Sequence, residues 1–122
     1  MKIFCILFFL PFIAEAKNVL KIATNNSTVI VKENVKKFRV DFTRDSKLIS
    51  RDISENYLKS IEDRLVKIQL MLPKKKCLTS AISIDLSRLG DQFVICQEDQ
   101  KNVHEVKGLM NLLAKDFHLI KK

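Results

Sequence analysis

The spacing of apolar residues changes period along the chain, and these changes constrain the fold more than any other feature. Between Val19 and Thr43, short strand-like runs are separated by polar turn residues, and Lys37–Thr43 alternates between apolar and polar residues, as in a strand with one face in water. From Ser50 to Leu72 apolar residues recur every three or four positions, as in an amphipathic helix. Both patterns then occur once more, in the same order. The sequence therefore predicts strands and helices that share one core.

Three strands are predicted in the first third of the chain. Val19–Ala23 and Thr28–Lys32 are separated by a cluster of turn-forming polar residues. Lys37–Thr43 alternates most clearly, with apolar side chains on one face and charged ones on the other. The simplest arrangement of these three strands is an antiparallel meander.

The helix predicted over Ser50–Leu72 has a continuous apolar stripe. Asp52, followed three residues later by Glu55, predicts a capping box at its start. Pro73 ends the helix, and the three lysines that follow favour its C-terminal dipole. The stripe consists of Ile53, Tyr57, Ile61, Leu65, Ile68 and Leu72, with Leu58 beside them.

Two further strands are predicted over Ala81–Leu86 and Gln92–Gln97, joined by a five-residue hairpin loop, Ser87–Asp91. This loop would pair Ile84 with Val94 and Ile82 with Cys96. Cys77 would then lie on the segment that leads from the helix into the hairpin.

A second helix is predicted from Asn102 to about Ile120, with Asn102 and Glu105 as a capping box. Taken together, these elements predict an α+β fold with the order β-β-β-α-β-β-α. We expect an antiparallel sheet of about five strands, with the two amphipathic helices on one face. The second apolar stripe consists of Val103, Val106, Met110, Leu113, Phe117 and Ile120.

Residues Met1–Ala16 have the pattern of a cleavable secretory signal peptide. Lys2 precedes an apolar run, Ile3–Ile13, and Ala14-Glu15-Ala16 supplies the small residues of a cleavage site. The run is shorter than the roughly 20 residues that span a bilayer, although an uncleaved anchor is the alternative. We therefore expect a single exported domain, residues 17–122, that is periplasmic or extracellular and has no transmembrane segment after cleavage.

The chain has three cysteines, and removal of Cys5 with the signal leaves two, Cys77 and Cys96. In an oxidising compartment two such thiols in a short domain are usually joined. A metal site is disfavoured because there is no C-x-x-C motif and no histidine at ligand spacing. We predict a Cys77–Cys96 disulfide, with no metal and no cofactor.

The net charge of the whole chain is +8, and the positive excess is uneven. Residues 17–47 have eight basic and three acidic side chains, residues 48–100 have eight of each, and residues 101–122 have five and two. If the first strands and the last helix adjoin, they form a basic surface that attracts polyanions or an acidic partner. The candidate polyanion contacts are Lys36, Lys37, Lys74, Lys75, Lys76, Lys121 and Lys122.

Catalytic patterns are weak. His104 and His118 are 14 residues apart on one predicted helix, roughly 21 Å, which is too far to share a phosphate. Glu62-Asp63 is expected on the solvated side of the first helix, and Glu98-Asp99 before the second. The scattered arginines and the few aromatics also disfavour specific nucleic-acid binding.

Asn25 and Asn26 begin two overlapping glycosylation sequons at the predicted tip of the first hairpin. They matter only in a eukaryotic host, which the sequence does not decide.

Three functions follow from these patterns. The leading hypothesis is a small exported binding or interaction module, inhibitor-like and not an enzyme, that is stabilised by one disulfide and binds a protein partner. The alternative is peripheral association with anionic envelope polymers or lipids through basic surface. The third, least supported, is a hydrolase whose site is not recognised.

Overall fold

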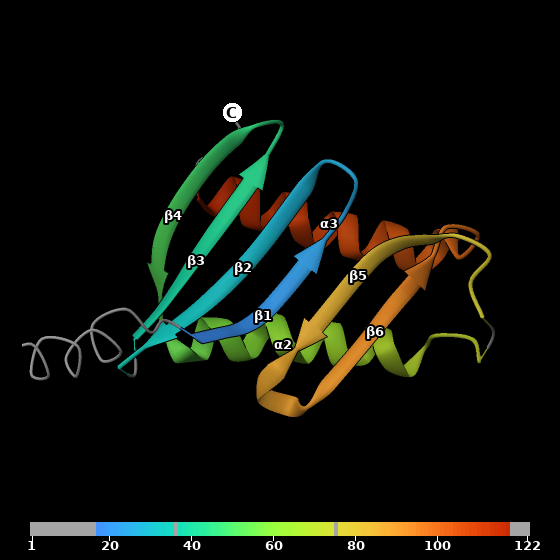
Figure 1. Ribbon diagram of the computed structural model, residues 1–122, viewed down its shortest axis with the longest axis horizontal. Coiled ribbons are helices and arrows are strands. Elements are labelled where there is room, and N and C mark those ends of the chain that lie inside the picture. The colour runs from blue at the N-terminus through green and yellow to red at the C-terminus, as the bar shows by residue number, and fades with distance from the viewer. Residues whose placement is uncertain (1–16, 36, 75, 118–122) are drawn as a thin grey trace, which may run out of the picture.

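Six strands form one antiparallel sheet, and two helices pack across one of its faces (Figure 1). This computed structural model describes residues 17–117, apart from Lys36 and Lys75. The order is β-β-β-β-α-β-β-α, so the predicted α+β class with two helices is confirmed and the sheet has one strand more than expected. The elements are β1 (Lys17–Ala23), β2 (Ser27–Asn34), β3 (Lys37–Arg44), β4 (Lys47–Ile53), α2 (Glu55–Leu70), β5 (Ser80–Leu86), η1 (Ser87–Leu89), β6 (Asp91–Cys96) and α3 (Gln100–Asp116).

The first strand lies in the middle of the sheet. The strand order is β4-β3-β2-β1-β5-β6, so the first four strands form a meander and β5 pairs with the free side of β1. That pairing joins residues from distant parts of the chain, such as Leu20 with Leu86 and Ile22 with Ile84. Strands β4 and β6 are therefore the two edges.

Strand β4 is not among the predicted strands, because its last residues also fit the start of the first helix. A two-residue turn precedes it, in which Asp45 and Ser46 both have positive φ, 51° and 67°, as in the type I′ turns of tight hairpins. Ile53 pairs with Phe38 across the sheet. The helix begins only at Glu55.

The expected capping boxes of both helices are wrong. Ser54 caps α2, and its hydroxyl accepts a hydrogen bond from the Tyr57 backbone N–H at 3.0 Å. Asp99 caps α3 and accepts from the Asn102 backbone N–H at 3.4 Å and from Asn102 Nδ2 at 2.7 Å. Asn102, the expected cap, lies inside the first turn and is buried. The residue whose side chain accepts a hydrogen bond from the first turn of each helix, Ser54 or Asp99, is therefore not one of the two residues predicted to form its capping box.

The predicted register of the β5–β6 hairpin is wrong by one residue. The connection is shorter than expected, with one 3₁₀ turn, η1, and Gly90 at φ 71°. As a result Ile84 pairs with Phe93, and Ile82 with Ile95. A shift of one residue exchanges the two faces of a strand. Phe93 and Ile95 therefore face the helices, while Val94 faces away from them.

The core lies between the sheet and the two helices. From α2 it takes Leu58, Ile61, Leu65 and Ile68, and from α3 it takes Val103, Val106, Met110 and Leu113, followed by Phe117 directly after the helix, all as predicted. Tyr57 and Leu72 are half-buried at its margin, and Ile120 lies outside the described residues. Each large apolar side chain that is fully buried stabilises the fold by about 1.5–3 kcal/mol.

The Cys77–Cys96 disulfide is present, as predicted, with 5.0 Å between the two Cα atoms. It joins the connection that follows α2 to the end of β6, and so links the helix layer to an edge of the sheet. The expected signal peptide, Met1–Ala16, lies outside the described residues. Between residues 17 and 117, no helix is both long and apolar enough to cross a membrane.

Candidate functional site: the open face of the sheet

The sheet face opposite α2 and α3, here called the open face, is not covered by any other described element (Figure 1). Strand pairing aligns six uncharged residues in one row that crosses all six strands, which we call the neutral row. Its outermost members are well exposed, Leu48 by 66% and Val94 by 45%. The row consists of Leu48, Thr43, Thr28, Ala23, Ser83 and Val94.

A second row runs beside the neutral row and is mixed in character. It consists of Ser50, Asp41, Ile30, Lys21, Asp85 and Gln92. Asp41 accepts a hydrogen bond from the Ser50 hydroxyl at 2.6 Å and pairs with the Lys32 ammonium at 3.3 Å. Burial raises the pKa of Asp41, but the Ser50 hydroxyl and the Lys32 ammonium outweigh it and hold the pKa below 3.8. This carboxylate is therefore held in its charged form.

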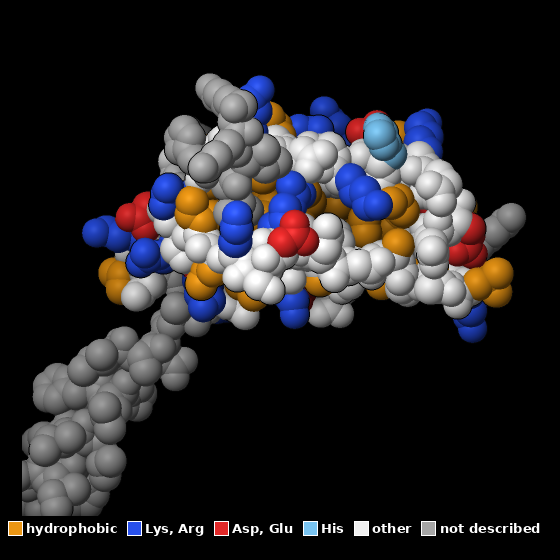
Figure 2. All heavy atoms as spheres, turned by 90° about the horizontal axis from the view of Figure 1, so that it is seen from above, with side chains coloured by type: hydrophobic (Ala, Val, Ile, Leu, Met, Phe, Trp, Pro, Cys, Tyr) orange, Lys and Arg blue, Asp and Glu red, His pale blue; other side chains and the backbone are white. Residues whose placement is uncertain are grey.

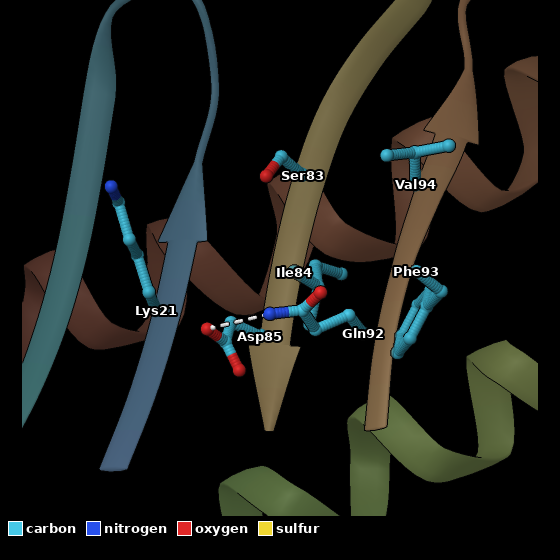
Figure 3. Close-up of a pocket in the computed structure, with 7 residues that line it drawn as sticks. All are labelled: Lys21, Ser83, Ile84, Asp85, Gln92, Phe93 and Val94. Atoms are coloured by element: carbon cyan, nitrogen blue, oxygen red, sulfur yellow. Dashed lines mark hydrogen bonds between the residues drawn. The ribbon is translucent and has the colours of Figure 1, made fainter. Parts of the chain in front are cut away.

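A hollow of about 470 Å³ lies on the open face over β1, β5 and β6. Figure 3 shows its polar side chains, Lys21 from β1, Ser83 and Asp85 from β5, and Gln92 from β6. Gln92 Nε2 donates to Asp85 Oδ2 at 3.4 Å, and Ser87 Oγ donates to the other carboxylate oxygen at 3.2 Å. The hollow thus offers an ammonium, a hydroxyl, an amide and a carboxylate, which suits recognition of polar groups such as a peptide backbone.

The three candidate polyanion contacts that the structure describes do not form one patch. Lys37 begins β3, at the end of the sheet where β1 starts. Lys74 and Lys76 lie in the connection between α2 and β5, at the opposite end. All three are exposed, and their binding of polyanions stays a prediction. The remaining four, Lys36, Lys75, Lys121 and Lys122, lie outside the described residues.

The basic side chains of the first strands are divided between the two faces of the sheet. Lys21 and Arg39 point to the open face, whereas Arg44 of β3 lies on the helix side and donates a hydrogen bond to Asn111 of α3 at 3.0 Å. The lysines of α3, such as Lys107 and Lys115, are exposed on the helix layer. Figure 2 shows lysine and arginine side chains spread along one side of the molecule, not gathered at one place. Only part of the basic excess of the first strands thus adjoins α3, and the attraction of polyanions by such a surface stays a prediction.

Glu62 contradicts the expectation that the Glu62-Asp63 pair is solvated. It is only 4% exposed, and its carboxylate lies 3.5 Å from Arg88 Nε. Arg88 also contacts Glu55 at 3.4 Å and stacks 5.4 Å from the centre of the Phe38 ring. Burial raises the pKa of Glu62, against the opposing effect of the Arg88 guanidinium. This cluster links η1 to α2 beneath the sheet.

Other candidates for chemistry are isolated. His104 is exposed on α3, and His118 lies outside the described residues. Asn25 and Asn26 are exposed at the β1–β2 turn, where an acceptor asparagine was expected. The described part of the chain contains no group of three or more metal-ligating side chains that could hold an ion.

Sequence reasoning missed the residues of the hollow. The alternation within Ala81–Leu86 already separates Ser83 and Asp85 from the apolar face of that strand. The alternation does not reveal that β1 pairs with β5, which brings Lys21 opposite Asp85. That pairing joins distant segments, and no local pattern encodes it.

Comparison of the chain with models of protein families, with curated proteins and with solved structures gives no match.

Proposed function

We propose that the protein is a small exported binding module that docks a protein partner on its open face. The observation that carries this proposal is the neutral row, which crosses all six strands without a charge. An exposed, uncharged strip beside a charged part of the same surface matches the layout of a protein interface, where charged residues are depleted at the core and the rim is polar.

The layout of charge on the open face supports docking. A third row, beyond the mixed one, contains Asp52, Arg39 and Lys32, so charged side chains lie toward one end of the face. Six strands about 4.8 Å apart and seven residues long make a face of roughly 650 Å². That area is close to the ~800 Å² that one partner contributes to a specific interface of standard size.

The hollow would orient such a partner. Its ammonium, carboxylate, hydroxyl and amide groups lie beside the apolar side chain of Val94. A few polar groups next to an apolar surface fix the direction of a bound chain, because an unpaired polar group at the interface is unfavourable. These groups favour recognition over catalysis.

Export is part of the proposal. It is supported by the signal-like residues Met1–Ala16 and by the disulfide, since disulfides persist mainly in oxidising compartments. Periplasmic or extracellular location would also make the partner an envelope or extracellular protein.

A site-specific crosslinking experiment tests the docking face. A photoreactive residue at Thr43 on the open face should give one discrete adduct in the native host, and unlabelled protein should compete it away. The same residue at Lys115 on α3 should not give that adduct. Equal adducts from both positions would contradict the proposal.

Substitution then separates docking from folding. Ser83→Arg places a charge in the neutral row and should remove the Thr43 adduct without a change in thermal stability. Leu112→Arg is the matched control, because Leu112 is 45% exposed on α3 and lies away from the open face. A Ser83→Arg protein that still crosslinks normally would exclude the open face as the docking surface.

A further inference from the structure

The last residue of α2 and the connection between α2 and β5 expose large apolar side chains in an unusual concentration. Leu78 is 92% exposed, Leu70 is 80% exposed and Met71 is 51% exposed. Scattered single apolar residues are normal on a protein surface, but a local group of them indicates a contact site. All three lie within nine residues of one another in the chain.

Basic residues are interleaved with these apolar side chains. Residues 64–84 contain no aspartate or glutamate, and they include five lysines and arginines. Of these, Lys67, Lys74 and Lys76 are exposed on or beside the connection. Apolar side chains mixed with lysines are the composition of surfaces that lie in the headgroup region of anionic bilayers.

Two acidic residues lie nearby, and each has a partner within the protein. Glu98 accepts a hydrogen bond from the Leu78 backbone N–H at 3.4 Å. Asp99 caps α3 and bonds to Asn102. The cations of residues 64–84 still exceed these two carboxylates, so the connection keeps a positive excess.

The fold holds the connection in place at the end of the molecule. It leaves α2 at Met71 and is fixed by the disulfide at Cys77 before it enters β5 at Ser80. In Figure 1 it forms the far right end, whereas β1 starts at the left. Lys17, where β1 begins, therefore lies at the end opposite the connection.

We propose that the α2–β5 connection is a contact site for the surface of an anionic lipid bilayer. Leu70, Met71 and Leu78 enter the boundary between headgroups and acyl chains, and the lysines pair with lipid phosphates. A hydrophilic polyanion would engage the lysines but leave the apolar side chains in water, so the observations favour lipid. This site is separate from the open face, and its test does not depend on a protein partner.

A tryptophan reporter tests the proposal in the full chain. The protein has no tryptophan, so Leu78→Trp introduces one reporter at the connection. Its emission should shift to the blue and be quenched by brominated acyl chains with vesicles of phosphatidylcholine and phosphatidylglycerol. Vesicles of phosphatidylcholine alone should have little effect. Because the reporter is local, membrane binding by residues 1–16 does not produce this signal.

Leu112→Trp is the matched control, since it places a reporter on an exposed apolar position of α3. Its emission should not change with either vesicle. Emission from the Leu78→Trp protein that is the same with and without anionic vesicles would overturn the proposal, as would an equal response from the Leu112→Trp protein.

Charge reversal separates lipid binding from nonspecific attraction. Lys74→Glu with Lys76→Glu should weaken binding to anionic vesicles by tenfold or more, since each lysine near such a surface contributes roughly fivefold. Lys107→Glu with Lys115→Glu on α3 changes the net charge equally and should have a smaller effect. If the two pairs weaken binding equally, or if an anionic polysaccharide binds as well as vesicles do, the proposed site is wrong.

Discussion

The two faces of the sheet are made by the same strands, yet they differ in what determines their residues. On the face toward the helices, positions such as Val40 and Phe42 are completely buried, and packing determines them. On the open face, their neighbours Asp41 and Thr43 are not part of the packed core. The uncharged residues of the neutral row are therefore not required by the core, which makes that row informative about function.

Carboxylates on the two faces differ in the same way. Asp41 on the open face has a lowered pKa because Ser50 and Lys32 outweigh the effect of its burial. Glu62 beneath the sheet has a raised pKa because burial outweighs the effect of Arg88. The pKa of a carboxyl group falls where its hydrogen bonds and nearby cations together outweigh the loss of water contact, and rises where they do not.

The largest expected difference between the faces is in unfolding free energy. Phe42→Ala, on the covered face, should reduce the free energy of unfolding by about 3–5 kcal/mol because it leaves a cavity in the core. Thr43→Ala, the next residue on the open face, should reduce it by less than about 1 kcal/mol. Urea denaturation measures both, and equal losses would contradict the assignment of the faces.

The disulfide joins the helix layer to the edge of the sheet, so its removal should loosen the two layers at one end. Cys77→Ala with Cys96→Ala should reduce the free energy of unfolding by about 3 kcal/mol, mainly because the unfolded chain gains conformational entropy when the loop is no longer closed. Thermal or urea unfolding measures this loss. A reductant should produce a similar loss in the unmodified protein, and no loss in either case would be inconsistent with a bond that stabilises the fold.

A smaller effect distinguishes the residue that caps α2 from one that lies on the open face. Ser54→Ala should reduce the free energy of unfolding by about 1 kcal/mol, because the Tyr57 N–H loses its acceptor. Asp52→Ala should change it by less than about 0.5 kcal/mol. The reverse ranking of these two variants would place the helix start at Asp52.

The smallest effect is a change in how stability depends on pH. Burial raises the pKa of Glu62 above the value of 4.5 that it has when unfolded, so the folded protein holds a proton that the unfolded chain releases. Stability from this group is present below pH 4.5 and is lost as pH rises through the folded pKa.

Glu62→Gln should remove that loss, seen as a flatter plot of urea midpoint against pH above 4.5. Asp41→Asn is the control. Because the pKa of Asp41 is lowered, its contribution to stability is present above pH 3.8 and is lost as pH falls below that value, the opposite of Glu62. A midpoint plot for Glu62→Gln that follows the unmodified protein would show that Glu62 does not titrate in this range.

Most of the fold was predictable because its signals are local. The two helices, five of the strands and the disulfide follow from apolar spacing and from the cysteine count. Strand β4 was missed because Ile53, which belongs to the sheet, also fits the helical spacing of α2. The turn before it has Asp45 and Ser46 at positive φ, without the glycine that usually marks such a hairpin.

The candidate site could not be predicted because it depends on register. The loop of the β5–β6 hairpin is one residue shorter than the sequence suggested, which moves Val94 from the core to the open face. The hollow further requires that Lys21 pair with Asp85 across two strands that are far apart in the chain. Local periodicity specifies which side chains share a face, but it does not specify which strands are neighbours.

The central position of β1 has a consequence for how the chain folds during synthesis. Its first neighbour, β2, follows at once, but its second, β5, is among the last elements to be made. Until then one side of Val19–Ala23 remains an unpaired strand edge, which can pair with other chains. Completion of the sheet therefore waits for the C-terminal third of the chain. A chaperone that protects this edge would have the largest effect while β1–β4 are present and β5 is not.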